Sequence, residues 1–207
     1  TCAVMGTASS MAVIAETLGV MLPNTASIPA VHADRLRASE QTGTVAAKMA
    51  IQGGPQLDQL ITEESVENAL RVLLSVSGST NAIIHLTAIA GRAGVEVDLK
   101  RFNELSDETP VLVDLKPVGT GYMEDFHYAG GLDGVLRVLA SQLNLQTLDV
   151  TGQSLEQRLQ KDRSKQADQS VIRTLQDPVD SQGGLIALHG TLAVSYTHLR
   201  AHETPVN

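Results

Sequence analysis

The sequence predicts an α/β fold, and three features indicate it. Segments with helical spacing alternate along the chain with short apolar stretches that are typical of buried strands. Apolar residues make up 43% of the 207 residues, which is enough to build a substantial core. Aromatic residues make up only 2%, so this core must consist of Ala, Val, Leu, Ile and Met, the usual material of helices packed on a sheet.

Three helices are expected in the first part of the chain. Residues 7–21 begin with small hydroxyl side chains that can cap free N–H groups, and their apolar positions recur at helical spacing. A second helix is expected across 33–51. A third starts at Thr62, whose hydroxyl can cap the first turn, and runs to about Ser75. Because Ser65 stands where a capping box has Glu or Gln, we expect a one-sided cap.

Helical and strand patterns continue to alternate in the rest of the chain. Helical patterns recur at 82–92, 98–108, 130–143 and 154–161. Strand patterns recur at 110–117, 145–152 and 183–193. Glycines bound the stretch 119–131, which we expect to be a loop.

Charge and composition exclude several classes of function. The formal net charge of −8 argues against a nucleic-acid partner, whose phosphates require clustered Lys and Arg. No apolar run approaches the roughly 18 residues that a membrane span needs. The start of the chain lacks the basic and apolar segments of a signal peptide, and a single cysteine excludes an internal disulfide framework. These features fit a cytoplasmic protein. Since the first residue is Thr, we expect the chain to be cut from a longer one.

The last residues, 194–207, break the pattern. His198 and His202 are four residues apart, a spacing that on a helix could present two imidazoles to a metal ion. No third ligand is near, and the HExxH order is absent. A disordered tail is the simpler interpretation. The stretch SYTHLRAHETPVN also resembles the translated read-through of a sequencing adapter, and we therefore expect residues 194–207 to be non-native and 1–193 to be a partial domain.

Cys2 is the first candidate site residue, because a thiolate before a helix is stabilised by the free N–H groups and the helix dipole. The small residues that follow it leave room for a bulky group. Three interpretations stand: an inert buried thiol, a nucleophile without a nearby His or acid, or a ligand of a metal or iron–sulfur cluster whose other ligands lie elsewhere.

A second candidate is the run Ser79, Thr80 and Asn81, which follows Gly78 and precedes a helix. Its N–H groups and polar side chains could bind an anion such as a carboxylate, but an ordinary helix cap has the same composition.

A third candidate lies in the expected loop at 119–131. Glu124, Asp125 and His127 could contact a metal ion or a substrate hydroxyl, and the simpler alternative is a solvated loop that leads into a helix. His32 and His85 are expected to be packed or capping histidines.

Four blocks of the sequence resemble one enzyme family. The first, TCAVMGTASSMAVIAETLGVMLPNTASIPAVHADR, resembles the dihydroxy-acid dehydratase family, which includes the sugar-acid dehydratases and phosphogluconate dehydratase. The blocks SGSTNAIIHLTAIAGRAGVEVDLKRFNELSDETPVLVDLKPVG, YMEDFHYAGG and GGLIALHGTLA are similar to further family segments, in family order across about 1–193. The resemblance implies a fragment of the family's N-terminal three-layer α/β domain, with the C-terminal barrel-like domain absent.

The resemblance implies a hydro-lyase that converts a 2,3-dihydroxy carboxylate into a 2-keto acid. Such enzymes hold an iron–sulfur cluster by three cysteines, and its open iron acts as a Lewis acid on the C3 hydroxyl while a base removes the C2 proton. Mg²⁺ holds the substrate carboxylate and C2 oxygen. Cys2 matches the third cluster cysteine, and we expect a [2Fe–2S] rather than a [4Fe–4S] cluster. Ser79, Thr80 and Asn81 are expected to bind substrate, and the parent enzyme is expected to be a homo-oligomer.

The chain also departs from the family pattern. The other two cluster cysteines and their acidic and lysine neighbours precede Thr1 in the family, and the glutamate ligand and serine base belong to the C-terminal domain. We therefore expect no catalytic residue within this fragment, no intact cluster and no activity, and we expect unpaired sheet edges and exposed apolar faces.

Gly6 and the loop 28–30 favour a sugar acid such as arabinonate or xylonate over dihydroxyisovalerate as the substrate. The rival hypothesis is a non-enzymatic α/β module that binds a small anion through Ser79–Asn81.

Overall fold

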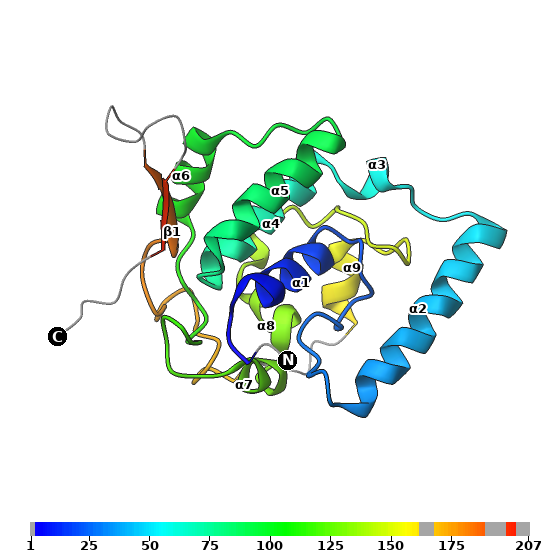
Figure 1. The fold of residues 1–207 in the computed structure, drawn as a ribbon, viewed down its shortest axis with the longest axis horizontal. Helices are drawn as coiled ribbons and strands as arrows, with labels where there is room; N and C mark the ends of the chain where they lie inside the picture. The colour runs from blue at the N-terminus through cyan, green and yellow to red at the C-terminus, as the bar shows by residue number, and fades with distance from the viewer. Residues whose placement is uncertain (1–2, 162–167, 189–197, 202–207) are drawn as a thin grey trace.

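The computed structural model describes residues 3–161, 168–188 and 198–201, and within these ranges the chain is mostly helical with few strands (Figure 1). The first helices are α1 (Thr7–Thr17), α2 (Ala33–Gln52), α3 (Leu57–Leu60), α4 (Glu63–Ser75) and α5 (Thr80–Arg92). They are followed by α6 (Leu99–Glu108), α7 (Met123–Tyr128), α8 (Gly131–Val138), the 3₁₀ helix η1 (Ala140–Gln142) and α9 (Leu155–Gln160). The strands are β1 (Leu185–Leu188) and β2 (His198–Ala201).

Helix α1 lies in the middle of the fold and contacts α4 and α5 (Figure 1). Two neighbouring residues of α1 enter different parts of the core. Val13 packs in a cluster with Phe126 and other side chains of α7 and α8, whereas Ile14 packs in a cluster with Phe102 and side chains of α4, α5 and β1. Because both residues are fully buried, α1 joins the two halves of the core.

Helix α1 ends earlier than its sequence pattern predicts. It stops at Thr17 rather than near residue 21, because Gly19 has a φ of 80° and turns the chain. A Cβ atom at Gly19 would lie 2.1 Å from the Leu148 carbonyl oxygen. The Val150 N–H donates to the Gly19 carbonyl over 2.8 Å. The end of α1 is therefore set by a segment distant in sequence, which periodicity alone does not reveal.

The cap of α4 is reciprocal, not one-sided as expected. The Thr62 hydroxyl accepts from the Ser65 N–H at 3.3 Å, and the Ser65 hydroxyl accepts from the Thr62 N–H at 2.9 Å. A serine hydroxyl can thus take the part that Glu or Gln plays in the usual capping box. The expectation of a one-sided cap was wrong because it allowed only Glu or Gln at position 65 to complete the capping box.

Two of the three predicted strands form no ladder with a neighbouring strand. In 110–117 only isolated bridges form, from Val111 to Asp180, Val113 to Ile172 and Leu115 to Gly121. The N–H groups of residues 112 and 113 both donate to the Ser75 carbonyl instead of to a neighbouring strand. The stretch 145–152 makes one bridge, between Leu148 and Ser154. The apolar pattern correctly indicated burial in 110–117, but in 145–152 only Asp149 is buried and turns interrupt the stretch. A strand also needs a partner along its length.

The third predicted strand forms over residues 185–188, and residues 189–193 lie outside the described ranges. Strand β1 pairs antiparallel with β2, with Leu185 opposite Ala201 and Leu188 opposite His198. Four residues of the expected tail are therefore in a strand, so the helix that would bring His198 toward His202 does not form at His198. His202 itself lies outside the described residues. That the sequence of 194–207 is non-native stays a prediction.

The expected loop at 119–131 contains the short helix α7. Asp125 accepts a hydrogen bond from the Tyr122 N–H at 2.8 Å and so caps its first turn. Met123 and Phe126, three residues apart, are buried against the core. The interpretation of this stretch as a solvated loop is therefore wrong, and this apolar pair was the signal that could have revealed the helix.

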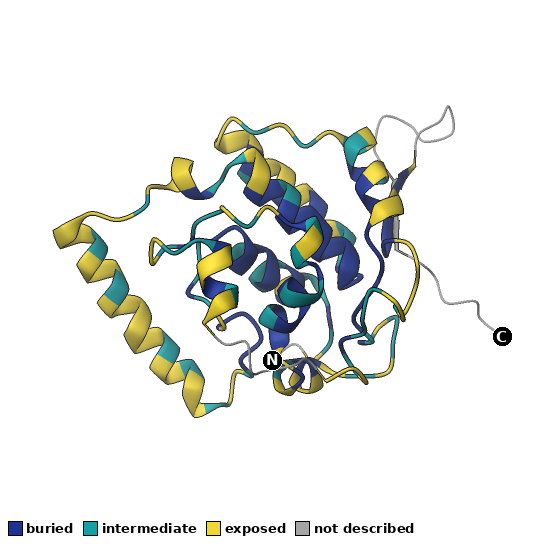
Figure 2. Ribbon diagram, turned by 180° about the vertical axis from the view of Figure 1, so that it is seen from behind, coloured by how far each residue is buried: buried dark blue, intermediate teal, exposed yellow. Residues whose placement is uncertain are grey.

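Helix α2 stands apart from the rest of the fold, and none of its residues is buried (Figure 2). Leu36 and Ile51 on this helix are 76% and 83% exposed. Because these two side chains lie near opposite ends of the helix, they do not form an apolar face, and the expectation that the chain exposes such faces stays a prediction. No helix among the described residues is both long enough and apolar enough to cross a membrane.

Candidate functional site

Cys2 lies outside the described residues, but the backbone directly after it is held in place on two sides. The Met123 N–H donates to the Ala3 carbonyl over 2.9 Å. The Met5 N–H donates to the Lys116 carbonyl over 2.9 Å, and the Met5 side chain is buried. The segment that follows the cysteine is therefore fixed between the first turn of α7 and the extended stretch 110–117.

The run Ser79, Thr80 and Asn81 meets the start of α1. The hydroxyls of Thr7 and Ser79 share a hydrogen bond of 2.8 Å, and the Asn81 amide donates to the Thr7 hydroxyl over 3.3 Å. The Ser79 N–H donates to the Ser10 hydroxyl over 2.9 Å. Two candidates that are distant in sequence, the segment after Cys2 and the Ser-Thr-Asn run, thus lie at adjoining helix N-termini.

Ser79 also caps its own helix, since its hydroxyl accepts from the Asn81 N–H at 3.3 Å. The capping interpretation of this run is therefore confirmed, and anion binding stays a prediction. Sequence reasoning missed Thr7 and Ser10 as partners of the run. Their only sequence signal was the hydroxyl cluster at the start of α1, which also suits a plain helix cap.

The backbone before this run is tightly constrained. A Cβ atom at Gly78 would lie 2.5 Å from Leu73 Cδ1 and 2.8 Å from the Ser10 hydroxyl, so α1 and the end of α4 approach too closely for a side chain here. Ser77 has a φ of 47°, which is unusual for a residue other than glycine. Its buried hydroxyl has no hydrogen-bond partner among the described residues. Strain of this kind is concentrated at functional sites.

A pocket of about 410 Å³ opens beside the start of α1. Its walls come from Ala3 and the first turns of α1, from the loop 26–31, and from the first turn of α7. Arg35, Glu124 and Asp125 contribute charged groups to its lining, and most of the other lining residues are small or apolar. This mixture of apolar walls and a few charged groups is typical of sites for small molecules.

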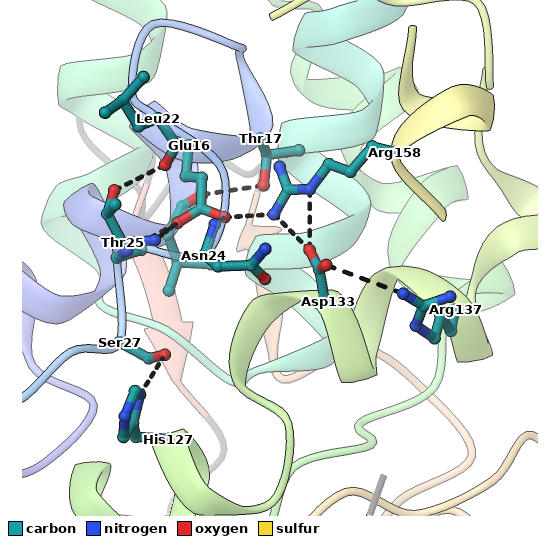
Figure 3. A network of polar contacts seen from close by, with 12 residues as sticks. Glu16, Thr17, Leu22, Asn24, Thr25, Ser27, His127, Asp133, Arg137 and Arg158 are labelled. Carbon is teal, nitrogen blue, oxygen red and sulfur yellow. Dashed lines mark hydrogen bonds and ion pairs between the residues drawn. The ribbon is translucent and has the colours of Figure 1, made fainter. Parts of the chain in front are cut away.

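Of the three candidate site residues in 119–131, two line this pocket and the third does not. Glu124 and Asp125 line it, although Asp125 is also engaged as the cap of α7. His127 faces Ser27, with 3.3 Å between its Nδ1 and the hydroxyl (Figure 3). Burial lowers the pKa of His127, and the charge of the nearby His32 lowers it further.

The two other histidines behave differently from each other. The expectation for His32 is confirmed, because its ring packs against those of His127 and Tyr128. His85 is exposed in the middle of α5 and is therefore neither packed nor capping, contrary to expectation.

A buried ionic network supports the pocket loop, and nothing in the sequence pattern predicts it. Glu16 is 1% exposed, and its carboxylate accepts from the N–H groups of Asn24 at 2.8 Å, Thr25 at 3.0 Å and Ala26 at 2.6 Å (Figure 3). The Arg158 guanidinium bonds to Glu16 and also to Asp133, with 2.8 Å from its Nε to Asp133 Oδ1. Burial opposes the charge of Arg158, but these two carboxylates outweigh it and raise its pKa.

The described residues do not by themselves fit a metal or cluster site. Within 3–161, 168–188 and 198–201, no group of three or more His, Cys, Asp or Glu side chains is arranged to hold a metal ion. The one cysteine of the chain, at position 2, lies outside these ranges. A cluster with three thiolate ligands therefore cannot be held by this chain alone.

Comparison with known proteins relates the chain to one group of enzymes. Residues 1–158 match the family described as dihydroxy-acid/6-phosphogluconate dehydratase N-terminal. The chain is 38% identical over 194 residues to a dihydroxy-acid dehydratase of Methanococcoides burtonii, a match that covers 93% of this chain and 35% of that protein. It is 43% identical over 185 residues to an L-arabonate dehydratase of Azospirillum brasilense, covering 88% of this chain and 31% of that protein.

These matches confirm the fold class predicted from the sequence, that of a partial N-terminal α/β domain. The chain spans about a third of the length of the curated relatives it matches. Because the family match covers well over half of the 207 residues, the chain belongs to the dihydroxy-acid/6-phosphogluconate dehydratase family and lies in its N-terminal domain.

Proposed function

We propose that the protein to which this chain belongs is a hydro-lyase that eliminates water from a 2,3-dihydroxy carboxylate. The substrate loses the hydroxyl group from C3 and the proton from C2 as water, and the resulting enol becomes a 2-keto acid. The family match over residues 1–158 carries this proposal, because the relatives named above are dehydratases of such acids. We also propose that this protein is a cytoplasmic homo-oligomer.

The described residues are proposed to bind and orient the substrate. The N-termini of α1 and α5 meet at Thr7 and Ser79, and the positive ends of both helix dipoles favour a carboxylate there. Thr80 is half-buried and Asn81 is exposed, so both side chains remain accessible to a ligand. We propose Ser79, Thr80 and Asn81 as substrate-binding residues and assign no acid or base role to any described residue.

Cys2 is proposed as one of three thiolates that hold an iron–sulfur cluster of the [2Fe–2S] type. The support is its position directly before the backbone segment that is fixed against α7, and the start of α1 at Thr7. When bound, such a cluster supplies a Lewis acid, and Mg²⁺ is proposed as a second ion. Because this chain has one cysteine, the other ligands must come from elsewhere in the protein.

This proposal makes a direct prediction for the 207-residue chain. Anaerobic reconstitution with iron and sulfide, followed by absorbance spectroscopy and iron analysis, should give no stoichiometric cluster. A stoichiometric [2Fe–2S] signal from this chain would refute the assignment of Cys2 as one of three thiolates.

Among the possible substrates we propose a sugar acid such as arabinonate or xylonate. Gly6 and the loop 28–30 favour this branch in the sequence. The 43% identity to the L-arabonate dehydratase, against 37–41% for the dihydroxy-acid dehydratases, points the same way by a small margin.

The full-length protein that contains this chain tests the proposal. It should be reconstituted with iron, sulfide and Mg²⁺ and assayed for 2-keto acid formation from L-arabinonate, D-xylonate and 2,3-dihydroxyisovalerate. We expect the pentonates to react faster than dihydroxyisovalerate. If dihydroxyisovalerate reacts faster, the substrate branch is wrong. If a cluster-loaded protein binds a carboxylate but converts none of the three, the non-enzymatic anion-binding alternative is favoured.

A further inference from the structure

Two histidines from distant parts of the sequence meet next to Ser27, one of the residues that line the 410 Å³ pocket. The rings of His32 and His127 pack edge to face, with centroids 5.6 Å apart and planes at 89°. Tyr128 packs against both rings, and its hydroxyl lies 3.0 Å from His32 Nε2. His127 Nδ1 lies 3.3 Å from the Ser27 hydroxyl. We name Ser27, His32, His127 and Tyr128 the histidine cluster.

The histidine cluster joins two walls of the pocket. Ser27 belongs to the loop 26–31, which forms one wall, and His32 directly follows that loop. His127 and Tyr128 are the last residues of α7, whose first turn forms the opposite wall. The Glu16 carboxylate fixes the loop at residues 24–26. Arg35 of α2 donates to the Thr25 and Ile28 carbonyls, and the histidine cluster connects Ser27 and His32 to α7.

The charges around His127 favour its neutral form. Burial is the main reason that its pKa is lowered, and the cationic groups His32 and Arg35 act in the same direction. Asp34 on α2 and Glu124 on α7 act in the opposite direction but do not outweigh them. A proton added to His127 therefore places a positive charge in a half-buried site beside Arg35 and a second imidazole.

We propose that the histidine cluster is a pH-sensitive latch on this pocket, in which the neutral imidazole of His127 holds the loop 27–32 against α7 and protonation of His127 releases it. The latch goes beyond the proposed function and acts whether or not the pocket binds substrate. Histidine is suited to this role because its ordinary charge change falls between pH 5 and 8.

The first test is an NMR titration of the histidine ring protons in the 207-residue chain between pH 5 and 8. We expect His127 to titrate below the ordinary value of 6.5. The variant His32→Gln should raise this midpoint, because it removes a repulsive positive charge. The control His85→Gln, in the exposed middle of α5, should leave it unchanged. A His127 midpoint that does not move in His32→Gln would overturn the coupling that the latch requires.

The second test measures the motion itself. Backbone hydrogen exchange at residues 27–32, corrected for the intrinsic effect of pH, should become about five- to tenfold faster when the pH falls from 7.5 to 5.5. The variant His127→Gln, which has no proton to gain in this range, should lose this pH dependence. The Glu16-bonded amides of residues 24–26 provide an internal control and should change little. Equal pH dependence in the wild type and in His127→Gln would contradict the latch.

The two proposals fail separately. Both tests are made without substrate, so a full-length protein that forms no 2-keto acid leaves the latch intact while refuting the proposed activity. An active dehydratase in which the exchange at 27–32 does not depend on pH refutes the latch alone.

Discussion

Glu16 and Arg158 form a buried ion pair, although 142 positions separate them in the sequence (Figure 3). Their side chains are 0% and 7% exposed. The pair joins α1 to α9, and the same carboxylate holds the backbone of the loop that forms a wall of the pocket. An interaction that stabilises the fold therefore also sets the shape of the candidate site.

Removing the arginine of this pair should lower the stability of the fold substantially. In Arg158→Met the carboxylates of Glu16 and Asp133 stay buried without their partner, and we expect a loss of about 3–5 kcal/mol in the free energy of unfolding. The control Arg101→Gln breaks ion pairs of a 41% exposed side chain and should cost less than about 1 kcal/mol. Urea denaturation followed by circular dichroism measures both. Equal losses in the two variants would contradict the role given to the buried pair.

A pair of glycine substitutions should have opposite effects. Gly19→Ala forces a Cβ to within 2.1 Å of the Leu148 carbonyl at a positive φ, and we expect it to lower stability by about 2–3 kcal/mol. Gly43→Ala lies in α2, where the added Cβ meets nothing within 4 Å, and should raise the helix stability by about 1 kcal/mol. Thermal denaturation of both variants checks the prediction. If Gly19→Ala leaves the stability unchanged, Gly19 and Leu148 do not approach each other as described.

Ser77→Gly should stabilise the protein by about 1 kcal/mol, because glycine adopts the φ of 47° without strain and the unpaired buried hydroxyl is removed. Ser77→Ala removes the hydroxyl but keeps the strained backbone, so it should gain less. Denaturant midpoints of the two variants and the wild type give the comparison. A stabilisation in Ser77→Ala that equals that in Ser77→Gly would mean that the backbone is not strained.

Stability should fall on acidification because of His127. The folded state lowers its pKa, whereas the unfolded chain keeps the ordinary value of 6.5, so the unfolded state binds more protons as the pH drops. The contribution is fully present above pH 6.5 and is lost as the pH falls through the folded pKa. Denaturation curves at several pH values should show this decline, and it should be shallower in His127→Gln. An equal slope in both proteins would exclude His127 as its source.

Local patterns predicted the helices well, because hydrophobic spacing and caps are encoded within a few residues. Helix α2 was expected at 33–51 and occurs at Ala33–Gln52, and Thr62 caps α4 as its position suggested. The strands at 110–117 and 145–152 were predicted wrongly, because strand formation depends on a neighbouring strand that a local pattern cannot reveal.

The candidate site was predictable only in part, for the same reason. Ser79–Asn81 and the segment after Cys2 were recognised separately, but their meeting at Thr7 depends on how α1 and α5 pack. The bond between Glu16 and Arg158 has no local signature at all, since each residue looks like an ordinary charged helix position. The histidine cluster likewise arises only when α7 packs against the loop before α2.

The central claim is that Cys2 belongs to the cluster site of a dehydratase. The most direct measurement compares the full-length protein that contains this chain with its Cys2→Ser variant, for bound iron and sulfide and for 2-keto acid formation from L-arabinonate. The account predicts that the wild type binds the cluster and is active. It predicts that the variant loses the cluster and that its activity falls at least about a hundredfold, which exceeds the loss of activity when a group that only supports a metal ligand is removed. A Cys2→Ser protein that keeps its iron and turns over at the wild-type rate would contradict it.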